Sequence, residues 1–329
     1  MKNKIFKILL EEENYISGEE ISDLVGISRS GVWKHINSLK EDGYDIEGIP
    51  RKGYMLKNRV DKLLLTEIIT ELNLKHWNKE NIYTYDIVDS TNIIAKKNAG
   101  EGKEEGSFFV AEEQTKGKGR MGRDWSSLHG KGIWFSFILR PEIMPTKASE
   151  ITFVIAVGIM EGIKKQIKKD VKIKWPNDIL LDGKKIVGIL TEISAEMERI
   201  NYIVAGVGIN VNQNLEDFPE DIRNKATSLK INTGEYVNRN ELLRKIIEEM
   251  ERIYYLYKEK GFGEILEIWK DNNITLGRRV KAITFDSEII GFAERIDDEG
   301  YLIIKDDTGK ENKILAGDVS LRNEDGSYF

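Results

Sequence analysis

Residues 1–60 carry three short helical patterns followed by a hairpin pattern, and this order constrains the fold more than any other feature of the chain. Apolar side chains recur at helical spacing near the start of the chain and again on both sides of Gly26, which fits a sharp turn. Ser17 and Glu20 form a capping-box pattern before the second helix, and Ser28 is placed to cap the third. Two short helices joined by a glycine-containing turn predict a helix-turn-helix.

A basic hairpin follows these helices. Residues 44–47 and 54–56 bracket the turn-forming segment 49–53, so residues 1–60 are predicted to form a winged helix-turn-helix. This module is neutral as a whole, but residues 28–59 contain seven basic residues and only four acidic ones. The local positive charge predicts DNA binding, and a winged helix used for protein contacts is the alternative. The predicted DNA-binding residues are Ser28, Arg29, Ser30, Gly31, Trp33, Lys34, Arg51 and Lys52.

Composition limits the chemistry of the chain. Its 329 residues suffice for roughly two or three domains. The absence of cysteine excludes disulfides and thiolate chemistry, and with only three scattered histidines we predict no metal-binding residues. No apolar run approaches the roughly 20 residues of a membrane helix, and the first residues lack a signal-peptide cleavage region, so we expect a cytoplasmic protein with no membrane partner.

The rest of the sequence shows two different hydrophobic patterns. Between residues 82 and 210, apolar strand patterns alternate with helical ones, and residues 150–167 and 240–271 are helical in pattern. After Gly277 the pattern changes to short alternating runs separated by turns rich in Asp and Gly, which predicts a small β-barrel of about 50 residues. The chain is therefore predicted to be a multidomain α+β protein.

Residues 115–123 combine three glycines with four cations, directly after a predicted strand. Gly117, Gly119 and Gly122 formally satisfy G-x-G-x-x-G, but a dinucleotide-binding loop has to open a helix, and the residues that follow lead into another strand. No GK[ST] follows, which excludes a Walker A loop. The segment predicts a flexible loop that presents N–H groups and cations to a phosphate or carboxylate. A basic surface turn is the alternative.

Four other places carry polar residues at the ends of predicted elements. Residues 174–178 (Lys-Trp-Pro-Asn-Asp) end an apolar strand, and Lys185 begins another, where it reaches a ligand or is simply solvated. Residues 206–210 (Gly-Val-Gly-Ile-Asn) put two glycines in a strand, which favours close approach of a ligand that Asn210 contacts. In residues 89–92 (Asp-Ser-Thr-Asn), the hydroxyls cap a helix or the helix start binds a ligand's polar head.

These segments in this order resemble the biotin–protein ligase family, in its bifunctional ligase/repressor form. The resemblance spans nearly the whole chain, and the combination of residues 174–178 with residues 117–123 is highly specific. Lipoate ligases share the fold, but their Arg-Arg and triple-glycine signature is absent. The resemblance implies a winged helix-turn-helix DNA-binding domain (1–60), a mixed α/β catalytic domain similar to class II aminoacyl-tRNA synthetases (61–274) and an SH3-like C-terminal domain (275–329).

The resemblance also implies a reaction. Biotin and ATP, with Mg²⁺, form biotinyl-5′-AMP, which then acylates a lysine of a biotin carboxyl carrier protein. The resemblance further implies that the chain represses biotin synthesis and uptake genes, as a ligand-promoted homodimer on operator DNA. Because this chemistry uses no Ser, Cys or His nucleophile, alignment and charge neutralisation supply the rate. The alternative is a ligand-sensing transcription factor with a non-catalytic ligase-like domain, against which the intact Arg120, Lys185 and Asn210 argue.

By the same resemblance, Arg120 and Lys185 are the catalytic residues, and Arg123 and Asn210 bind the nucleotide. Two positions depart from the family pattern. Met121 stands where the best-known members carry Arg, and Lys118 replaces a common Arg, which keeps the charge but loses the bidentate fork. The residues implied to bind biotin or biotinyl-AMP are Ser90, Thr91, Asn92, Gln114, Lys118, Gly119, Arg120 and Lys185.

Overall fold

The computed structural model divides the chain into two compact units, Met1–Leu72 (unit 1) and Asn73–Phe329 (unit 2). The residues that it describes are 1–284, 287–315, 320–325 and 327–329. The segment 61–72 groups with the helix-turn-helix in this division. The domain limits drawn from the sequence after residues 60 and 274 stay predictions.

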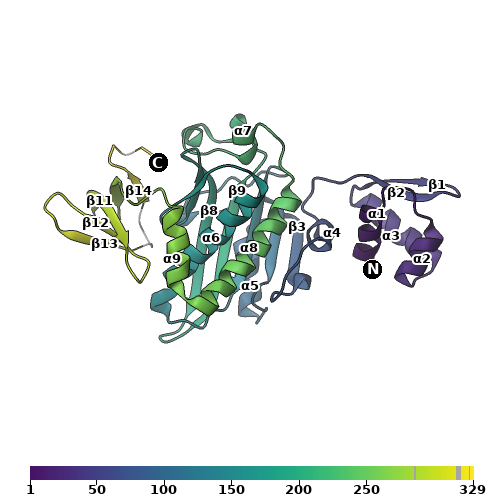
Figure 1. Cartoon of the computed structure of the whole chain (residues 1–329), viewed down its shortest axis with the longest axis horizontal. Coiled ribbons are helices and arrows are strands. Elements are labelled where there is room, and N and C mark those ends of the chain that lie inside the picture. Colours follow the sequence, from purple (N-terminus) through teal and green to yellow (C-terminus); the bar gives the residue numbers. More distant parts are fainter. Residues whose placement is uncertain (285–286, 316–319, 326) are drawn as a thin grey trace. The chain divides into compact units, whose positions relative to one another are not determined.

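Unit 1 has the predicted helices and hairpin (Figure 1). The capping box is present, because Ser17 Oγ accepts from the N–H of Glu20 and the Glu20 carboxylate accepts from the N–H of Ser17. Gly26 ends the second helix at a φ of 71°, and Ser28 Oγ caps the third. The elements are α1 (Lys2–Glu11), α2 (Gly18–Val25), α3 (Arg29–Glu41), β1 (Asp45–Ile49), β2 (Gly53–Asn58) and α4 (Leu65–Thr70).

Unit 2 is built on a mixed sheet in the order β3-β4-β5-β9-β8-β7-β6. Among the described strand pairs of this sheet, β3 and β4 alone are parallel, because α5 carries the chain across between them. The strands are β3 (Ile82–Val88), β4 (Phe108–Gln114), β5 (Gly132–Leu139), β6 (Val171–Lys174), β7 (Asp178–Leu181), β8 (Lys184–Ala195) and β9 (Ile200–Asn210). The helices are α5 (Thr91–Gly100), α6 (Ala148–Gln166), α7 (Leu229–Thr233), α8 (Arg239–Lys260) and α9 (Phe262–Asp271).

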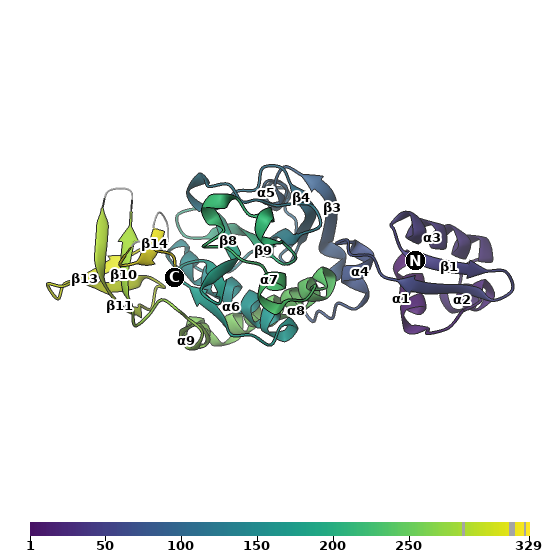
Figure 2. The same cartoon turned by 90° about the horizontal axis from the view of Figure 1, so that it is seen from above.

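Helices cover both faces of this sheet (Figure 2). Neighbouring residues of a strand point to opposite faces, and β5 shows which helices lie on each. Ile138 packs in one cluster with Ala95 of α5, whereas Phe137 lines a small void with Val154 of α6 and Met250 of α8. The sheet is therefore a central layer between α5 and the α6–α8 pair.

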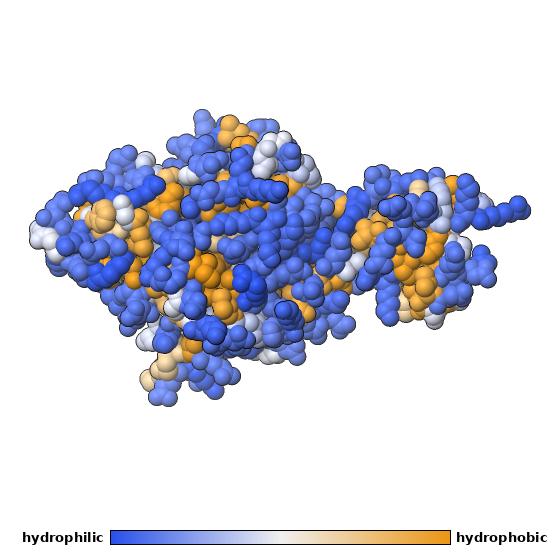
Figure 3. All heavy atoms as spheres, in the orientation of Figure 1, coloured by the Kyte–Doolittle hydropathy of each residue, from blue (hydrophilic) through white to orange (hydrophobic). Residues whose placement is uncertain are grey.

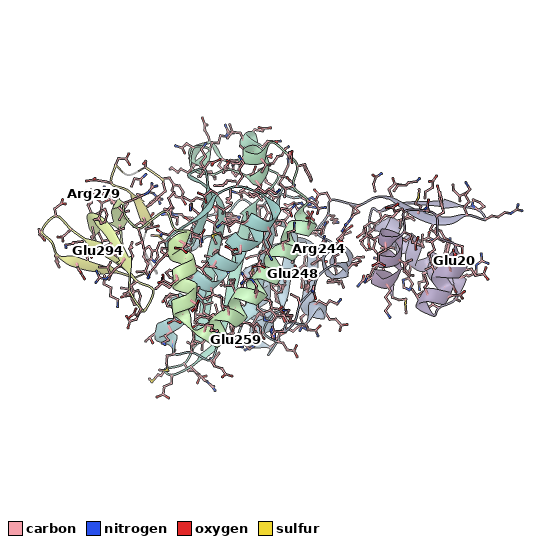
Figure 4. All side chains as sticks on the ribbon, in the orientation of Figure 1. Glu20, Arg244, Glu248, Glu259, Arg279 and Glu294 are labelled. Atoms are coloured by element: carbon pink, nitrogen blue, oxygen red, sulfur yellow. The ribbon has the colours of Figure 1, made fainter. Side chains whose placement is uncertain are left out.

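Side chains of α8 also anchor the start of unit 2. Glu248, labelled in Figure 4, accepts a hydrogen bond from the N–H of Asn73 at 2.8 Å. The buried Glu251 accepts from three successive N–H groups, of Lys75, His76 and Trp77. These bonds satisfy backbone donors that no regular element pairs.

The C-terminal part of unit 2, for which a small β-barrel was predicted, is a small antiparallel sheet in the order β13-β12-β11-β10-β14. It packs on the rest of unit 2, since Ser149 Oγ donates to the carbonyl of Glu299 at 2.7 Å. Arg279, labelled in Figure 4, forms ion pairs with Asp307 and Glu324, which lie in two different turns of this sheet. The strands are β10 (Arg279–Ile283), β11 (Glu288–Ile296), β12 (Leu302–Lys305), β13 (Glu311–Ile314) and β14 (Ser320–Asn323), and residues 285–286, 316–319 and 326 lie outside the described residues.

The structure differs from the sequence prediction in two places. The helical pattern 240–271 forms two helices, because Gly261 takes a φ of 81° between α8 and α9. The short strand β7 directly after the 174–178 motif was not predicted, since its four residues carry no alternation. On the face in Figure 3, hydrophilic residues predominate. None of the described helices is long and apolar enough to cross a membrane.

Candidate active site

A cavity of about 660 Å³ opens in unit 2 beside the start of α5. The residues around it come from α5, the end of β4, the 115–123 loop, β8 and β9, which the sheet places next to one another. All ten residues implied to bind biotin, the adenylate or the nucleotide line this cavity: Ser90, Thr91, Asn92, Gln114, Lys118, Gly119, Arg120, Arg123, Lys185 and Asn210. Their roles remain predictions, but the structure brings them together.

The start of α5 presents polar groups to the cavity. Thr91 donates from both its N–H and its hydroxyl to Gln114 Oε1, at 2.8 and 3.0 Å. Gln114 Nε2 in turn donates to Ser127 Oγ at 3.0 Å, so the amide is held from both ends. Ser90 is the N-cap residue by position, but its side chain makes no capping hydrogen bond. The helix-capping alternative for these hydroxyls is therefore wrong.

The two glycines of β9 leave no room for a Cβ, because other side chains of this chain pack directly against them. A Cβ on Gly206 would lie 2.0 Å from Asn92 Oδ1, and a Cβ on Gly208 would lie 2.2 Å from Trp125 Nε1. Asn92 and Trp125 therefore approach this strand closely, and both glycines also line the cavity, so the expected approach of a ligand stays a prediction. Asn92 is held there by Ser136 Oγ, which donates to its Oδ1 at 2.5 Å.

The 115–123 loop forms a compact turn. The N–H of Gly119 donates to the carbonyl of Arg123 at 2.8 Å, and a 3-10 turn at Arg120–Gly122 leads on to β5 without an α-helix. A dinucleotide-binding loop is thereby excluded. Lys118 is exposed and pairs with Asp124 at 2.7 Å. Met121 is half exposed, in a left-handed conformation with a φ of 56°.

Arg120 is held over the cavity by the 174–178 motif. Its Nη1 donates to Asn177 Oδ1 at 2.8 Å. Asn177 is itself fixed by β8, because its Nδ2 donates to the carbonyl of Ile189 at 2.6 Å and its own carbonyl accepts from the N–H of Ile189. A bonded amide thus holds one edge of the guanidinium, which matters because cations in such a site need a fixed position.

Lys185 is held by Asp178, with Nζ 2.5 Å from Oδ1. Burial alone would raise the pKa of the Asp178 carboxyl, but Lys185 and Lys174 hold that pKa well below its usual range. Lys174 is almost fully buried, and burial lowers the pKa of its ammonium to about 7. The hydroxyl of Tyr328, from the C-terminal part of unit 2, donates to Asp178 Oδ2 at 2.5 Å.

Asn210 lies at the end of β9 and is nearly buried. Its Oδ1 accepts from Nε2 of Gln213 at 3.2 Å, and Gln213 lines the same cavity. Arg123 is exposed at its rim. Among the described residues, no group of three His, Asp or Glu side chains is arranged to hold a metal ion.

The predicted DNA-binding residues of unit 1 form an exposed surface on α3 and the β1–β2 turn. Trp33 is 60% exposed, an unusual position for a large apolar side chain, and Lys34 is exposed beside it. Two of the predicted positions are less available. Ser28 Oγ accepts the capping hydrogen bond from the N–H of Gly31, and Gly31 is half buried. The exposed positions are Ser28, Arg29, Ser30, Trp33, Lys34, Arg51 and Lys52.

Three parts of the chain match known families. Residues 84–210 match the biotin/lipoate A/B protein ligase family, residues 2–55 an HTH domain and residues 275–322 the biotin protein ligase C-terminal domain. Over 326 residues the chain is 40% identical to the bifunctional ligase/repressor BirA of Bacillus spizizenii, across 98% of this chain and 100% of that relative. The chain belongs to the biotin protein ligase family.

Further biotin protein ligases agree with this assignment. The bifunctional ligase/repressor BirA of Escherichia coli is 31% identical over 315 residues, which cover 96% of this chain and 95% of that relative. The biotin protein ligase from Aquifex aeolicus in complex with biotin and ATP matches with a TM-score of 0.65 and 31% identity, over 74% of this chain and 100% of that chain. The predicted family and fold class are confirmed.

In this biotin protein ligase, the residues around the cavity include several that the sequence-based site omitted. Lys174, Asn177 and Asp178 lie within a motif that the sequence marked as unusual, but their side-chain roles depend on β8. Trp125 carries no local signal of its contact with the β9 glycines. Tyr328 lies far along the chain from every motif and could not have been found from spacing.

Proposed function

We propose that this chain is an ATP-dependent, AMP-forming biotin–protein ligase. A carboxylate oxygen of biotin attacks the α-phosphorus of ATP, supplied as its magnesium complex, and pyrophosphate leaves. The amine of a lysine on a biotin carboxyl carrier protein then attacks the acyl carbon of biotinyl-5′-AMP, AMP leaves and the amine loses a proton. The observation that supports this proposal is the convergence of all ten family-implied residues on one cavity.

The cavity's own residues fit the first step. Arg120 and Lys185 each bring a positive charge into it, and both are held by neighbours, Asn177 and Asp178. Fixed cations stabilise charge that builds up on a phosphate and a carboxylate without reorganising during the reaction. The hydrogen-bonding groups at the start of α5 suit the polar ureido head of biotin, and they orient its carboxylate toward the cations.

We propose that unit 1 binds operator DNA and makes the chain a biotin-responsive repressor of biotin synthesis and uptake genes. Its surface residues offer few phosphate-binding cations, and residues 1–60 are neutral as a whole. A single copy is therefore expected to bind weakly, and pairing on a two-fold symmetric site is the usual remedy. Biotinyl-5′-AMP would favour the homodimer, and by linkage operator DNA would tighten the liganded dimer. We place these steps in the cytoplasm.

The transfer of labelled biotin to a purified carrier protein, with and without ATP, tests the ligase. ATP-dependent labelling of one lysine is expected. Labelling without ATP would contradict the adenylate route, and no labelling at all alongside ligand-dependent DNA binding would favour a non-catalytic sensor. Sedimentation and operator binding with and without biotin plus ATP test the repressor. If neither self-association nor operator affinity changes, the protein is a ligase with a DNA-binding domain that does not sense biotin.

A further inference from the structure

The Asp178 carboxylate joins two lysines of the cavity to the C-terminal part of unit 2. Its Oδ1 lies 2.5 Å from Lys185 Nζ, whereas its Oδ2 accepts from the hydroxyl of Tyr328 at 2.5 Å. Lys174 Nζ also faces Oδ2, but at 3.8 Å. The rings of Tyr328 and Phe329 lie over that ammonium, with centroids at 4.3 and 4.9 Å. One carboxylate thus has three donors within reach, and Tyr328 holds the oxygen that Lys174 faces.

We propose that Tyr328 is a positioning residue for biotinyl-5′-AMP formation, which keeps Asp178 engaged by Lys185 and not by Lys174. This inference rests on the proposed ligase function. Tyr328 acts through Asp178 and has no part in the chemistry itself. Its role is to give the carboxylate one fixed orientation, so that Lys185 stays at a constant place in the cavity.

The competition between the lysines is set by charge and burial. Burial lowers the pKa of Lys174 most, Asp178 opposes it, and the positive Arg322, Lys185 and Arg120 add to the lowering; together they bring this pKa to about 7. The phenol remains a donor throughout, because burial and then Asp178 raise the pKa of Tyr328 well above its ordinary value. Without the hydroxyl, the ion pair recorded for Asp178 Oδ2 among the described residues is that with Lys174, and a protonated Lys174 would draw the carboxylate away from Lys185.

Tyr328→Phe is the first test, because it removes the hydroxyl and keeps the ring over Lys174. The kcat for biotinyl-5′-AMP formation at pH 7 should fall about tenfold, as for the loss of one hydrogen bond to a charged group, while KM for biotin stays unchanged. The loss should shrink as pH rises and Lys174 becomes neutral. Tyr257→Phe is the matched control, since its hydroxyl makes a similar buried bond at 2.6 Å to Glu150, away from the cavity.

A double variant tests the mechanism. If Tyr328 acts by keeping Lys174 away from Asp178, then Tyr328→Phe should lower kcat much less in a Lys174→Met background. The pH dependence of that loss in kcat should vanish there too. A loss in Tyr328→Phe that is equal at all pH values, is unaffected by Lys174→Met or is matched by Tyr257→Phe would overturn the positioning role. So would full activity in Tyr328→Phe.

A readout without activity separates this inference from the proposed function. A wild-type chain that forms no biotinyl-5′-AMP overturns the ligase proposal, and unfolding then decides the role of Tyr328. Because the folded-state pKa of Lys174 lies below its ordinary 10.5, the free energy of unfolding should rise with pH between about 7 and 10.5. In Tyr328→Phe, closer pairing of Lys174 with Asp178 should raise the pKa of Lys174. The free energy of unfolding should then increase less with pH than in the wild-type chain. An equal rise in both proteins contradicts the inference.

Discussion

The two candidate binding regions of this chain are built in opposite ways. The predicted DNA-binding surface of unit 1 comes from residues 28–52, and its cations Lys34, Arg51 and Lys52 are exposed. The cavity of unit 2 draws on residues from Ser90 to Tyr328, and much of its wall is buried. Exposed cations act nearly independently and are screened by salt. Buried polar groups depend on one another, because each satisfies the next.

This difference predicts different responses to mutation. Single changes in the cavity should have large effects that spread through shared partners, whereas single changes on the unit 1 surface should be small and close to additive. The following changes test that contrast, from the largest expected effect to the smallest.

Lys185→Ala should lower biotinyl-5′-AMP formation by about 100-fold to 1,000-fold, because it removes a fixed cation and leaves Oδ1 of the Asp178 carboxylate without its ion-pair partner. Lys184→Ala, at an exposed position beside it, is the control and should keep full activity. The rate of adenylate formation is measured by pyrophosphate release. Operator binding without ligand should be equal in both variants, and a loss there would point to misfolding.

Gly208→Ala should destabilise unit 2 by about 3 kcal/mol, because the new Cβ would meet the Trp125 ring at 2.2 Å between packed strands. The matched control is Gly263→Ala in α9, where nothing lies within 4 Å of the new Cβ, and a gain of about 0.5–1 kcal/mol is expected there. Denaturant unfolding measures both. If Gly208→Ala is as stable as the wild-type chain, Trp125 can move aside freely. That result would contradict the view that the residues of the cavity wall depend on one another.

Arg120→Ala should release biotinyl-5′-AMP about tenfold faster, since it removes a charge-assisted donor from the loop. The freed adenylate should then label lysines of unrelated proteins, which mass spectrometry detects. Arg120→Lys keeps the charge but not the guanidinium bond to Asn177. Its rate of adenylate release should therefore lie between those of the wild-type chain and Arg120→Ala. Unchanged release in Arg120→Ala would remove this residue from the adenylate site.

Lys34→Ala and Arg51→Ala should each weaken operator binding only a few-fold, and each should reduce the salt dependence of binding by about one unit of slope. Their effects should add, and biotin transfer should be unaffected. Lys7→Ala, at an exposed position on α1 paired with Glu11, is the control with no expected effect on DNA binding. A loss in either variant that is independent of salt would mean that the residue does not contact phosphate.

The same contrast explains how much could be predicted. The helix ends of unit 1 follow from neighbours in sequence: Ser17 caps through Glu20, three residues away, and Gly26 takes the left-handed conformation that ends α2. The membership of the cavity was also predictable, because each motif sits at the end of a strand or helix that the hydrophobic pattern places. The side chains that lie against the β9 glycines could not be predicted, since Asn92 and Trp125 lie far from them in sequence.

By itself, the sequence determined the local geometry and the family: the caps of the winged helix, the loop that cannot open an α-helix, and the residues that converge on one cavity. Tertiary structure alone decided which polar groups partner each other. Asp178 meets Lys185 because β7 pairs with β8 through a register shift that sets Lys185 opposite Leu180, and it meets Tyr328 because the C-terminal sheet packs beside them. Capping bonds span a few residues of fixed backbone, whereas these contacts depend on how separate elements pack, and no short stretch of sequence encodes that.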